Sequence, residues 1–217
     1  MDPGQPPIYN QGELGSCTAN AIAAAVQFER RDQKIDDFTP SRLFIYYNER
    51  VMEGTIRQDA GAMIRDGVKS VSVVGACSES MWKYDISKFT KKPSVSCYKD
   101  GIKRKATAYR RVPRTLNDFK AAIYERNLLI FGFAVYDSFM SVETAKTGIA
   151  KVPSKNESML GGHAVAAVGW DDSRQSFIVR NSWGIEWGLE GFFYLPYDYF
   201  LDDNLSDDFW VVTHIKS

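Results

Sequence analysis

The pattern of apolar and polar positions divides the chain into two unlike halves. Residues 17–31 read CTANAIAAAVQFERR, a run that is apolar on nearly every side and ends in two arginines. Alanine is the strongest helix former, a helix that is apolar all round is usually buried, and cations suit a helix C-terminus. The pattern therefore predicts a buried central helix that begins at Cys17, with Ser16 as its cap.

Two further helices and a less regular stretch complete the first half. Apolar residues recur at helical spacing after Ser41 and again after Gly61, which predicts helices at about 41–52 and 62–71. Residues 76–100 show no period and are predicted to be irregular. The first half is therefore predicted to be mainly helical.

The second half has the two-residue period of β-strands. Thr115 and Asp118 predict the start of one more helix, at about 116–126. Asp171-Asp172-Ser173 predicts a hairpin turn. Strands are predicted at about 106–112, 128–136, 148–152, 163–170, 176–179, 191–195 and 209–215. The fold class is therefore α+β, and a cleft between the helical half and the antiparallel half is the expected place for a site.

Composition narrows the classes of function. The 217 residues are 44% apolar and 13% aromatic, which is typical of a globular protein. Lys+Arg and Asp+Glu number 27 each, so bulk charge indicates neither a nucleic-acid nor a membrane partner. No apolar run approaches the roughly 18 residues of a membrane helix. The first ten residues lack the features of a signal peptide, and cytoplasmic and exported locations both stay open.

Candidate chemistry lies at Cys17, His163, Asn181 and Gln11. A thiol at the first turn of a helix meets unpaired N–H groups and the positive end of the dipole, which favours the thiolate. His163 follows two glycines that leave its ring accessible, and an asparagine can fix the tautomer of an imidazole. The Gln11 amide could donate to an oxyanion beside the Cys17 N–H. Each residue alone also fits a packing or loop role, so the inference rests on their combination.

Together the four residues match the order of the papain type of cysteine protease. That type places a nucleophilic Cys near the start, with His and Asn roughly 130–150 residues or more downstream. The segments that carry the match read QGELGSC at 11–17, GGHAVAAVGW at 161–170 and NSWGIEWGLEGFF at 181–193. The sequence therefore resembles papain-like cysteine peptidases of the papain and cathepsin family, nearly from end to end.

The resemblance implies one catalytic domain with a two-lobe papain-like fold over residues 1–217. A helical lobe of about 1–105 plus a tail of about 206–217 would face a barrel-like antiparallel β lobe of about 106–205. The active site would lie in the cleft between the lobes. The implied activity is hydrolysis of peptide bonds, with an endopeptidase expected.

The resemblance also implies a role for each matched residue. Cys17 would be the nucleophile and His163 its partner in a thiolate–imidazolium pair. Asn181 would orient His163, and Trp183 would cover that hydrogen bond from water. Gln11 and the Cys17 backbone N–H would form the oxyanion hole.

Substrate contacts and partners follow from the same resemblance. Gly61, in the loop Gln58-Asp59-Ala60-Gly61, would pair with the backbone of an extended peptide. Gly162 and Trp183 are expected to border the substrate as well. A peptide or protein substrate is expected, with an inhibitory N-terminal segment or a protein inhibitor as a further partner. The implied enzyme is a monomer that needs neither metal nor cofactor.

The chain departs from the family pattern around the nucleophile. The family usually reads Cys-Gly-Ser-Cys-Trp, whereas this chain has Leu14-Gly15-Ser16-Cys17-Thr18. Leu14 replaces a cysteine that is normally disulfide-bonded, and Thr18 replaces an aromatic residue. Both changes favour a bacterial or other non-lysosomal branch of the family. Cys77 and Cys97 are close enough in sequence to pair, but a reduced, buried state is favoured.

Two alternatives stay open. A relative could keep the fold and the thioester step but act as an acyltransferase or deamidase with another acceptor. An inactive relative could serve only as a binding module. Retention of Cys17, His163, Asn181 and Gln11 argues against the inactive module.

Overall fold

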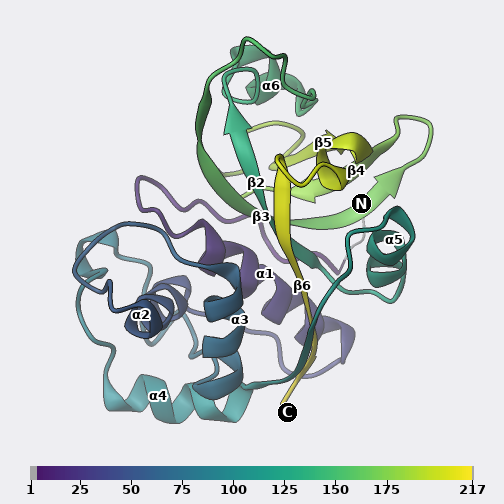
Figure 1. The fold of residues 1–217 in the computed structure, drawn as a ribbon. Coiled ribbons are helices and arrows are strands. Elements are labelled where there is room, and N and C mark those ends of the chain that lie inside the picture. Colours follow the sequence, from purple (N-terminus) through teal and green to yellow (C-terminus); the bar gives the residue numbers. More distant parts are fainter. Residues whose placement is uncertain (1–3, 217) are drawn as a thin grey trace.

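The computed structural model describes residues 4–216 and combines a group of helices with one twisted sheet (Figure 1). The helices are α1 (Cys17–Asp32), α2 (Arg42–Glu53), α3 (Ile64–Val73), α4 (Val95–Gly101), α5 (Leu116–Tyr124), α6 (Val142–Thr147) and α7 (Tyr197–Leu201), with short 3-10 helices η1 (Ile86–Lys88) and η2 (Ile102–Arg104). The strands are β1 (Ala106–Arg111), β2 (Leu129–Tyr136), β3 (Met159–Asp171), β4 (Ser176–Arg180), β5 (Phe192–Pro196) and β6 (Ser206–Ile215). None of the described helices is long and apolar enough to span a bilayer.

Helix α1 is the central element, as its apolar pattern predicted. Its residues from Thr18 to Arg30 are all buried. It contacts α2 and α3 as well as β3 and β6, and it lies between the helices and the sheet in Figure 1. The cap prediction is wrong in one respect, because the Ser16 side chain makes no capping hydrogen bond. Its hydroxyl is bonded to Tyr84 and Asn20 instead.

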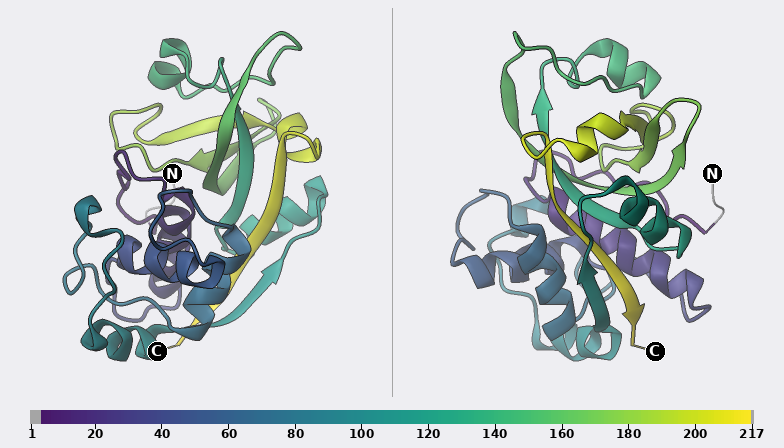
Figure 2. Two further views of the ribbon diagram at one scale, coloured as in Figure 1. Left: turned by 60° about the vertical axis from the view of Figure 1, so that its left-hand side comes forward. Right: turned by 45° about the vertical axis from the view of Figure 1, so that its right-hand side comes forward.

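The sheet has six strands in the order β1-β6-β2-β3-β4-β5, and each neighbouring pair is antiparallel. The long β3 pairs with β2 on one side and with β4 on the other, and the predicted hairpin turn at 171–173 joins β3 to β4. The turned views in Figure 2 show β6, in yellow, running from the β half down beside the helices. The last strand therefore connects the two halves of the molecule.

Two large hydrophobic clusters fill the two halves, and the sheet contributes side chains to both. Strand β2 sends Ile130 into the cluster around α1, and it sends Leu129 and Phe131 into an aromatic-rich cluster within the β half. Strand β3 alternates in the same way, with Ala164 and Val165 in different clusters. Because successive side chains of a strand point to opposite faces, one sheet can close two cores.

Several elements differ from the sequence-based expectation. No strand forms at 148–152, because Gly148 adopts a left-handed conformation that ends α6, and only an isolated bridge joins Ile149 to Tyr194. Helices α4, α6 and α7 were not predicted. They have seven, six and five residues, so each is too short to show a helical period. Cys77 and Cys97 are free, buried thiols in the helical half.

Candidate active site

A cleft of about 500 Å³ lies where the beginning of α1 meets β2 and β3. Cys17 and His163 both line it, and so do Gly61 and Gly162. These residues come from three segments that are far apart in the sequence. The fold therefore brings the predicted nucleophile, the predicted imidazole and two of the predicted substrate contacts to one cavity.

Cys17 is the first residue of α1, so its sulfur lies at the end of the helix where N–H groups have no helical partner. Burial raises the pKa of the Cys17 thiol, and the nearby carboxyl of Glu49 raises that pKa further. The backbone N–H groups of Ala164, Thr18 and Cys17 itself act in the opposite direction and lower that pKa. Ala164 directly follows His163, which places the sulfur beside the histidine strand.

The His163 ring is held in one tautomer by Asn181. Nε2 of His163 lies 2.8 Å from Oδ1 of Asn181. The backbone N–H of Ser182 donates to the same Oδ1 at 2.8 Å, which identifies that atom as the oxygen. Nε2 must therefore carry the proton in this bond, and Nδ1 is left for chemistry in the cleft.

Aromatic rings lie against the His163 imidazole. The Trp183 ring stacks on the imidazole with centroids 4.7 Å apart and an angle of 20° between the planes, and Phe133 lies 5.7 Å away. Trp183 is not among the described residues that line the cleft. Burial among these rings lowers the pKa of His163 to about 4, although the bond to Asn181 acts to raise it.

Gln11 is bound to the segment that follows Asn181. Its backbone N–H donates to the Ser182 carbonyl at 2.9 Å, and the Ser182 hydroxyl donates to Oε1 of Gln11 at 2.7 Å. Because Oε1 is engaged in this way, the amide nitrogen faces the other side, where it donates to the Leu14 carbonyl at 3.1 Å. The second hydrogen of this nitrogen has no partner among residues 4–216. Gln11 is not among the described residues that line the cleft.

Residues 4–200 match the papain family of cysteine proteases, and this range covers most of the chain. The chain belongs to that family. It is 45% identical over 215 residues to an uncharacterized peptidase C1-like protein of Acanthamoeba polyphaga mimivirus, and the match covers 95% of this chain and 69% of that protein. It is 30% identical to pro-cathepsin H of Bos taurus, with 86% of this chain and 55% of the precursor covered.

Solved structures agree with the assignment of this chain to the papain family. Xylellain, a cysteine protease from Xylella fastidiosa, superposes with a TM-score of 0.91 at 44% identity, and the match covers 98% of this chain and 83% of the other. The predicted α+β class, papain-like fold and cysteine-peptidase activity are thereby confirmed. The two relatives at 44–45% identity come from a bacterium and a virus, in line with the predicted non-lysosomal branch.

The loop that contains Gly61 is hydrogen-bonded to the loop before Cys17. The Asp59 carboxylate accepts the Gly15 backbone N–H at 3.0 and 3.1 Å and the Tyr46 hydroxyl at 2.5 Å. Gly61 has a φ of +75°, a conformation that favours glycine, and its backbone lies beside the Gly15 carbonyl. These contacts position the Gly61 backbone on the wall of the cleft.

The rest of the cleft lining combines apolar and acidic residues. Met63, Ile64, Phe133 and Leu205 supply apolar surface, and the acidic residues are Asp203, Asp207 and Asp208. Asp207 is paired with Arg114 at 3.3 Å and with Arg111 at 3.5 Å. Within residues 4–216, by contrast, no basic side chain forms an ion pair with Asp203 or Asp208. Asp208 accepts hydrogen bonds from Trp210 Nε1 and the Arg65 backbone N–H, and Asp203 accepts one from Asn204 Nδ2. Because these donors carry no full charge, the negative charge of both carboxylates stays uncompensated beside the apolar surface.

A buried carboxyl bonded to Thr18, the residue after Cys17, was not expected from the sequence. Thr18 Oγ1 donates to Oε2 of Glu49 at 2.7 Å, and Glu49 is fully buried. Gly67 of α3 makes room for it, since a Cβ at that position would come within 2.4 Å of Glu49 Oε1. Burial raises the pKa of Glu49 to about 8. A glutamate within an apolar helical pattern was the only available signal, and it does not point to Thr18.

Proposed function

We propose that this papain-like peptidase cuts peptide bonds by a thioester mechanism centred on Cys17 and His163. The observation that carries the proposal is the pair of donors on Asn181 Oδ1, which commits Nε2 of His163 to Asn181 and leaves Nδ1 for the cleft. The Cys17 sulfur borders the same cleft at the start of α1. Thioester chemistry requires a nucleophile, a base beside it and a group that orients the base, and Cys17, His163 and Asn181 supply them in that order.

The proton moves between Cys17 and His163 as a coupled step. Burial alone opposes each charge, since it raises the pKa of the thiol and lowers that of the imidazole. When the thiolate and the imidazolium form together, their attraction offsets the two desolvation costs. The N–H groups at the start of α1 stabilise the thiolate further.

The reaction then proceeds in two stages. The Cys17 thiolate attacks the carbonyl carbon, and the negative charge on the carbonyl oxygen is stabilised by the Gln11 amide and the Cys17 N–H. Nδ1 of His163 gives its proton to the departing amine, and the C–N bond breaks to leave a thioester. Water then attacks the thioester with His163 as base, which releases the acid and restores the thiol.

The cleft lining supports a peptide substrate of a particular kind. The Gly61 backbone would pair with an extended peptide, with Gly162 on the lining beside His163. A lysine or arginine side chain has an apolar stem and a charged end, which fit the apolar wall and the uncompensated charges of Asp203 and Asp208. An inhibitory segment or protein inhibitor would act by occupying the same cleft.

A peptide library tested with the wild-type protein and Cys17→Ala examines this function. We expect cleavage by the wild type and a loss of kcat on the order of 10⁶-fold in Cys17→Ala, with an unchanged circular dichroism spectrum. Full cleavage by Cys17→Ala would overturn the proposal. Labelling by an epoxide that needs both Cys17 and His163, without cleavage of any peptide, would indicate an acyltransferase or deamidase instead.

A further inference from the structure

We propose that Tyr84 is a positioning residue for the oxyanion hole. Its hydroxyl joins the backbone of Gln11 to the side chain of Ser16, and these residues lie at the two ends of the loop that precedes the nucleophile. The proposal rests on the proposed function, because it assigns the oxyanion to Gln11 and the Cys17 N–H. Tyr84 itself touches neither substrate nor the reacting atoms.

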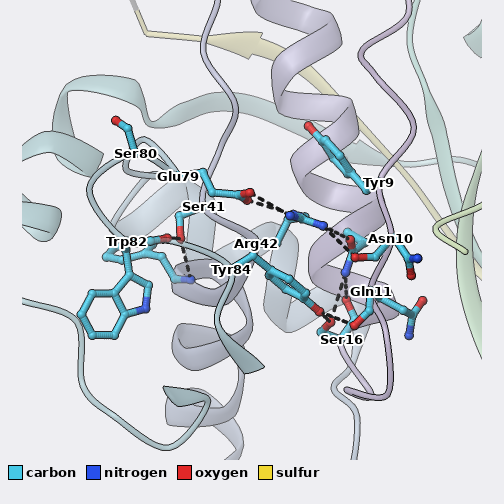
Figure 3. A network of polar contacts seen from close by, with 12 residues as sticks. Tyr9, Asn10, Gln11, Ser16, Ser41, Arg42, Glu79, Ser80, Trp82 and Tyr84 are labelled. Carbon is cyan, nitrogen blue, oxygen red and sulfur yellow. Dashed lines mark hydrogen bonds and ion pairs between the residues drawn. The ribbon is translucent and has the colours of Figure 1, made fainter. Parts of the chain in front are cut away.

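The hydrogen-bond directions at Tyr84 follow from chemistry. Its hydroxyl lies 2.8 Å from the Gln11 carbonyl oxygen and 2.5 Å from Ser16 Oγ. A carbonyl can only accept, so the single hydrogen of Tyr84 is donated to Gln11. The Ser16 hydroxyl must therefore donate to Tyr84. Figure 3 shows the Tyr84 ring pointing at these two partners.

The same direction continues on the far side of Ser16. Nδ2 of Asn20 donates to Ser16 Oγ at 3.1 Å and to the Ser16 carbonyl at 2.9 Å. Nη1 of Arg42 in turn donates to Oδ1 of Asn20 at 3.3 Å. Donors thus follow one another from the Arg42 guanidinium through Asn20, Ser16 and Tyr84 to the Gln11 carbonyl. Hydrogen bonds aligned head to tail polarise one another and strengthen the whole chain.

Arg42 contacts this series of hydrogen bonds at two places, Asn20 and the Tyr84 ring. Glu79 accepts two hydrogen bonds from its guanidinium, at 2.9 and 2.7 Å, and the Asn10 carbonyl accepts another at 3.1 Å (Figure 3). The guanidinium also lies over the Tyr84 ring, 3.9 Å from its centroid, and over the Tyr9 ring at 4.8 Å. A ring held by a cation in this way keeps its hydroxyl aimed at Gln11.

This series of hydrogen bonds matters because the two oxyanion donors are held by different parts of the molecule. Gln11 is bonded to Ser182 of the β half, whereas the Cys17 N–H belongs to α1. Tyr84 and Ser16 connect the Gln11 backbone directly to the start of α1. Burial raises the pKa of Tyr84, so its hydroxyl keeps its hydrogen at neutral pH and can donate it to Gln11.

Tyr84→Phe removes the hydroxyl and keeps the ring over Arg42. We expect kcat to fall about tenfold with little change in KM. One oxyanion donor typically raises the rate by roughly 100- to 1000-fold, and the variant should lose part of that rate enhancement because the oxyanion hole is less well positioned. Inhibition by a peptide aldehyde should weaken by a similar factor, since its adduct with Cys17 places an oxyanion in the hole. The rate of alkylation of Cys17 by iodoacetamide should stay at the wild-type value, because that reaction forms no oxyanion.

Two further variants keep the test sharp. Ser16→Ala breaks the same chain without altering Tyr84, so it should reproduce the losses in kcat and aldehyde binding. Tyr98→Phe is the matched control, because it removes a hydroxyl that donates to Asn48 at 3.1 Å elsewhere in the helical half. Its kcat should equal that of the wild type. Adding Tyr84→Phe to Gln11→Ala should cause no further loss, since both act on one donor.

The outcomes separate this inference from the proposed function. Wild-type turnover with an unchanged kcat in Tyr84→Phe would overturn the role of Tyr84 alone. An equal loss of alkylation rate would also overturn it, because Tyr84 would then act on the thiolate. If the losses of kcat from Tyr84→Phe and Gln11→Ala multiplied in the double variant, the role of Tyr84 would also be overturned. A wild-type protein that neither cleaves peptides nor binds the aldehyde would refute the proposed function and this inference with it.

Discussion

The Thr18 hydroxyl donates to the Glu49 carboxyl at 2.7 Å, one residue after the proposed nucleophile. The second oxygen of this fully buried carboxyl has no partner among the described residues. Burial raises the pKa of Glu49 from 4.5 to about 8; nearby Glu53 and Asp66 act in the same direction, and the Thr18 bond and Arg50 oppose it. Glu49 is therefore protonated in the folded peptidase at neutral pH and ionised in the unfolded chain.

Glu49→Gln should flatten the pH dependence of stability. Between about pH 4.5 and pH 8 the folded state binds one more proton than the unfolded state at Glu49. The free energy of unfolding therefore loses about 1.4 kcal/mol per pH unit as pH rises through this window. Urea unfolding of both proteins across this window measures the effect, and the gap between them should grow in favour of Glu49→Gln as pH rises. Parallel curves would contradict the prediction.

His163 should titrate at a low pKa when its thiolate partner is absent. Burial lowers its pKa from 6.5 to about 4, and Cys17→Ala removes the opposite charge that offsets this effect. NMR titration of the ring in Cys17→Ala should therefore give a value near 4. Because the folded-state pKa is depressed, the contribution of His163 to stability is complete above about pH 6.5 and is lost as pH falls through about 4. A pKa near 6.5 in this variant would show that the ring is solvated.

Asn181→Ala should reduce kcat less than His163→Ala. Asn181 fixes the tautomer through a 2.8 Å bond, whereas His163 carries the proton. We expect a loss on the order of 10²-fold for Asn181→Ala and on the order of 10⁴-fold or more for His163→Ala. Steady-state kinetics on one peptide compares the two variants. The rate of Cys17 alkylation in each variant shows whether the amount of thiolate has changed. Equal losses would mean that Asn181 does more than orient the ring.

Asp203 and Asp208 should set a preference for basic side chains. Asp203→Asn combined with Asp208→Asn should lower kcat/KM about tenfold for peptides that place lysine in the cleft. It should leave norleucine analogues nearly unchanged, because the apolar wall is intact. Partly exposed charge pairs contribute about 1 kcal/mol or less each, which sets this magnitude. Asp198→Asn, an exposed change outside the cleft, is the control. Similar losses on both peptides would refute a charge-based preference.

The catalytic candidates were predictable from the sequence because each lies in a contiguous motif. Cys17 follows a glycine-rich turn at the start of an apolar helix, and Asn181 begins a segment of tightly spaced tryptophans and glycines. The major strands and the first three helices were found for a similar reason, since a period over eight or more residues is visible without tertiary context. The absence of a strand at 148–152 depends on the backbone of Gly148, which residue identity alone does not determine.

The supporting residues could not be found in this way. Tyr84 contacts Gln11 across 73 positions, and Glu49 contacts Thr18 across 31. These bonds depend on how α2 and the loop after α3 pack against the start of α1. No local pattern in the sequence encodes that packing. The position of Ser16 before α1 predicts a helix cap, whereas its hydroxyl is bonded to Tyr84 in the structure. The motifs thus indicate which groups react, while the tertiary packing shows what holds them.

The loop at 10–16 is bonded to both sides of the molecule, to Ser182 across the sheet and to Tyr84 across the helices. A shift of one half against the other at this loop would break the hydrogen bonds on one side of it. Gln11 is therefore held from two sides, so a variant that weakens either set of bonds should loosen the same amide.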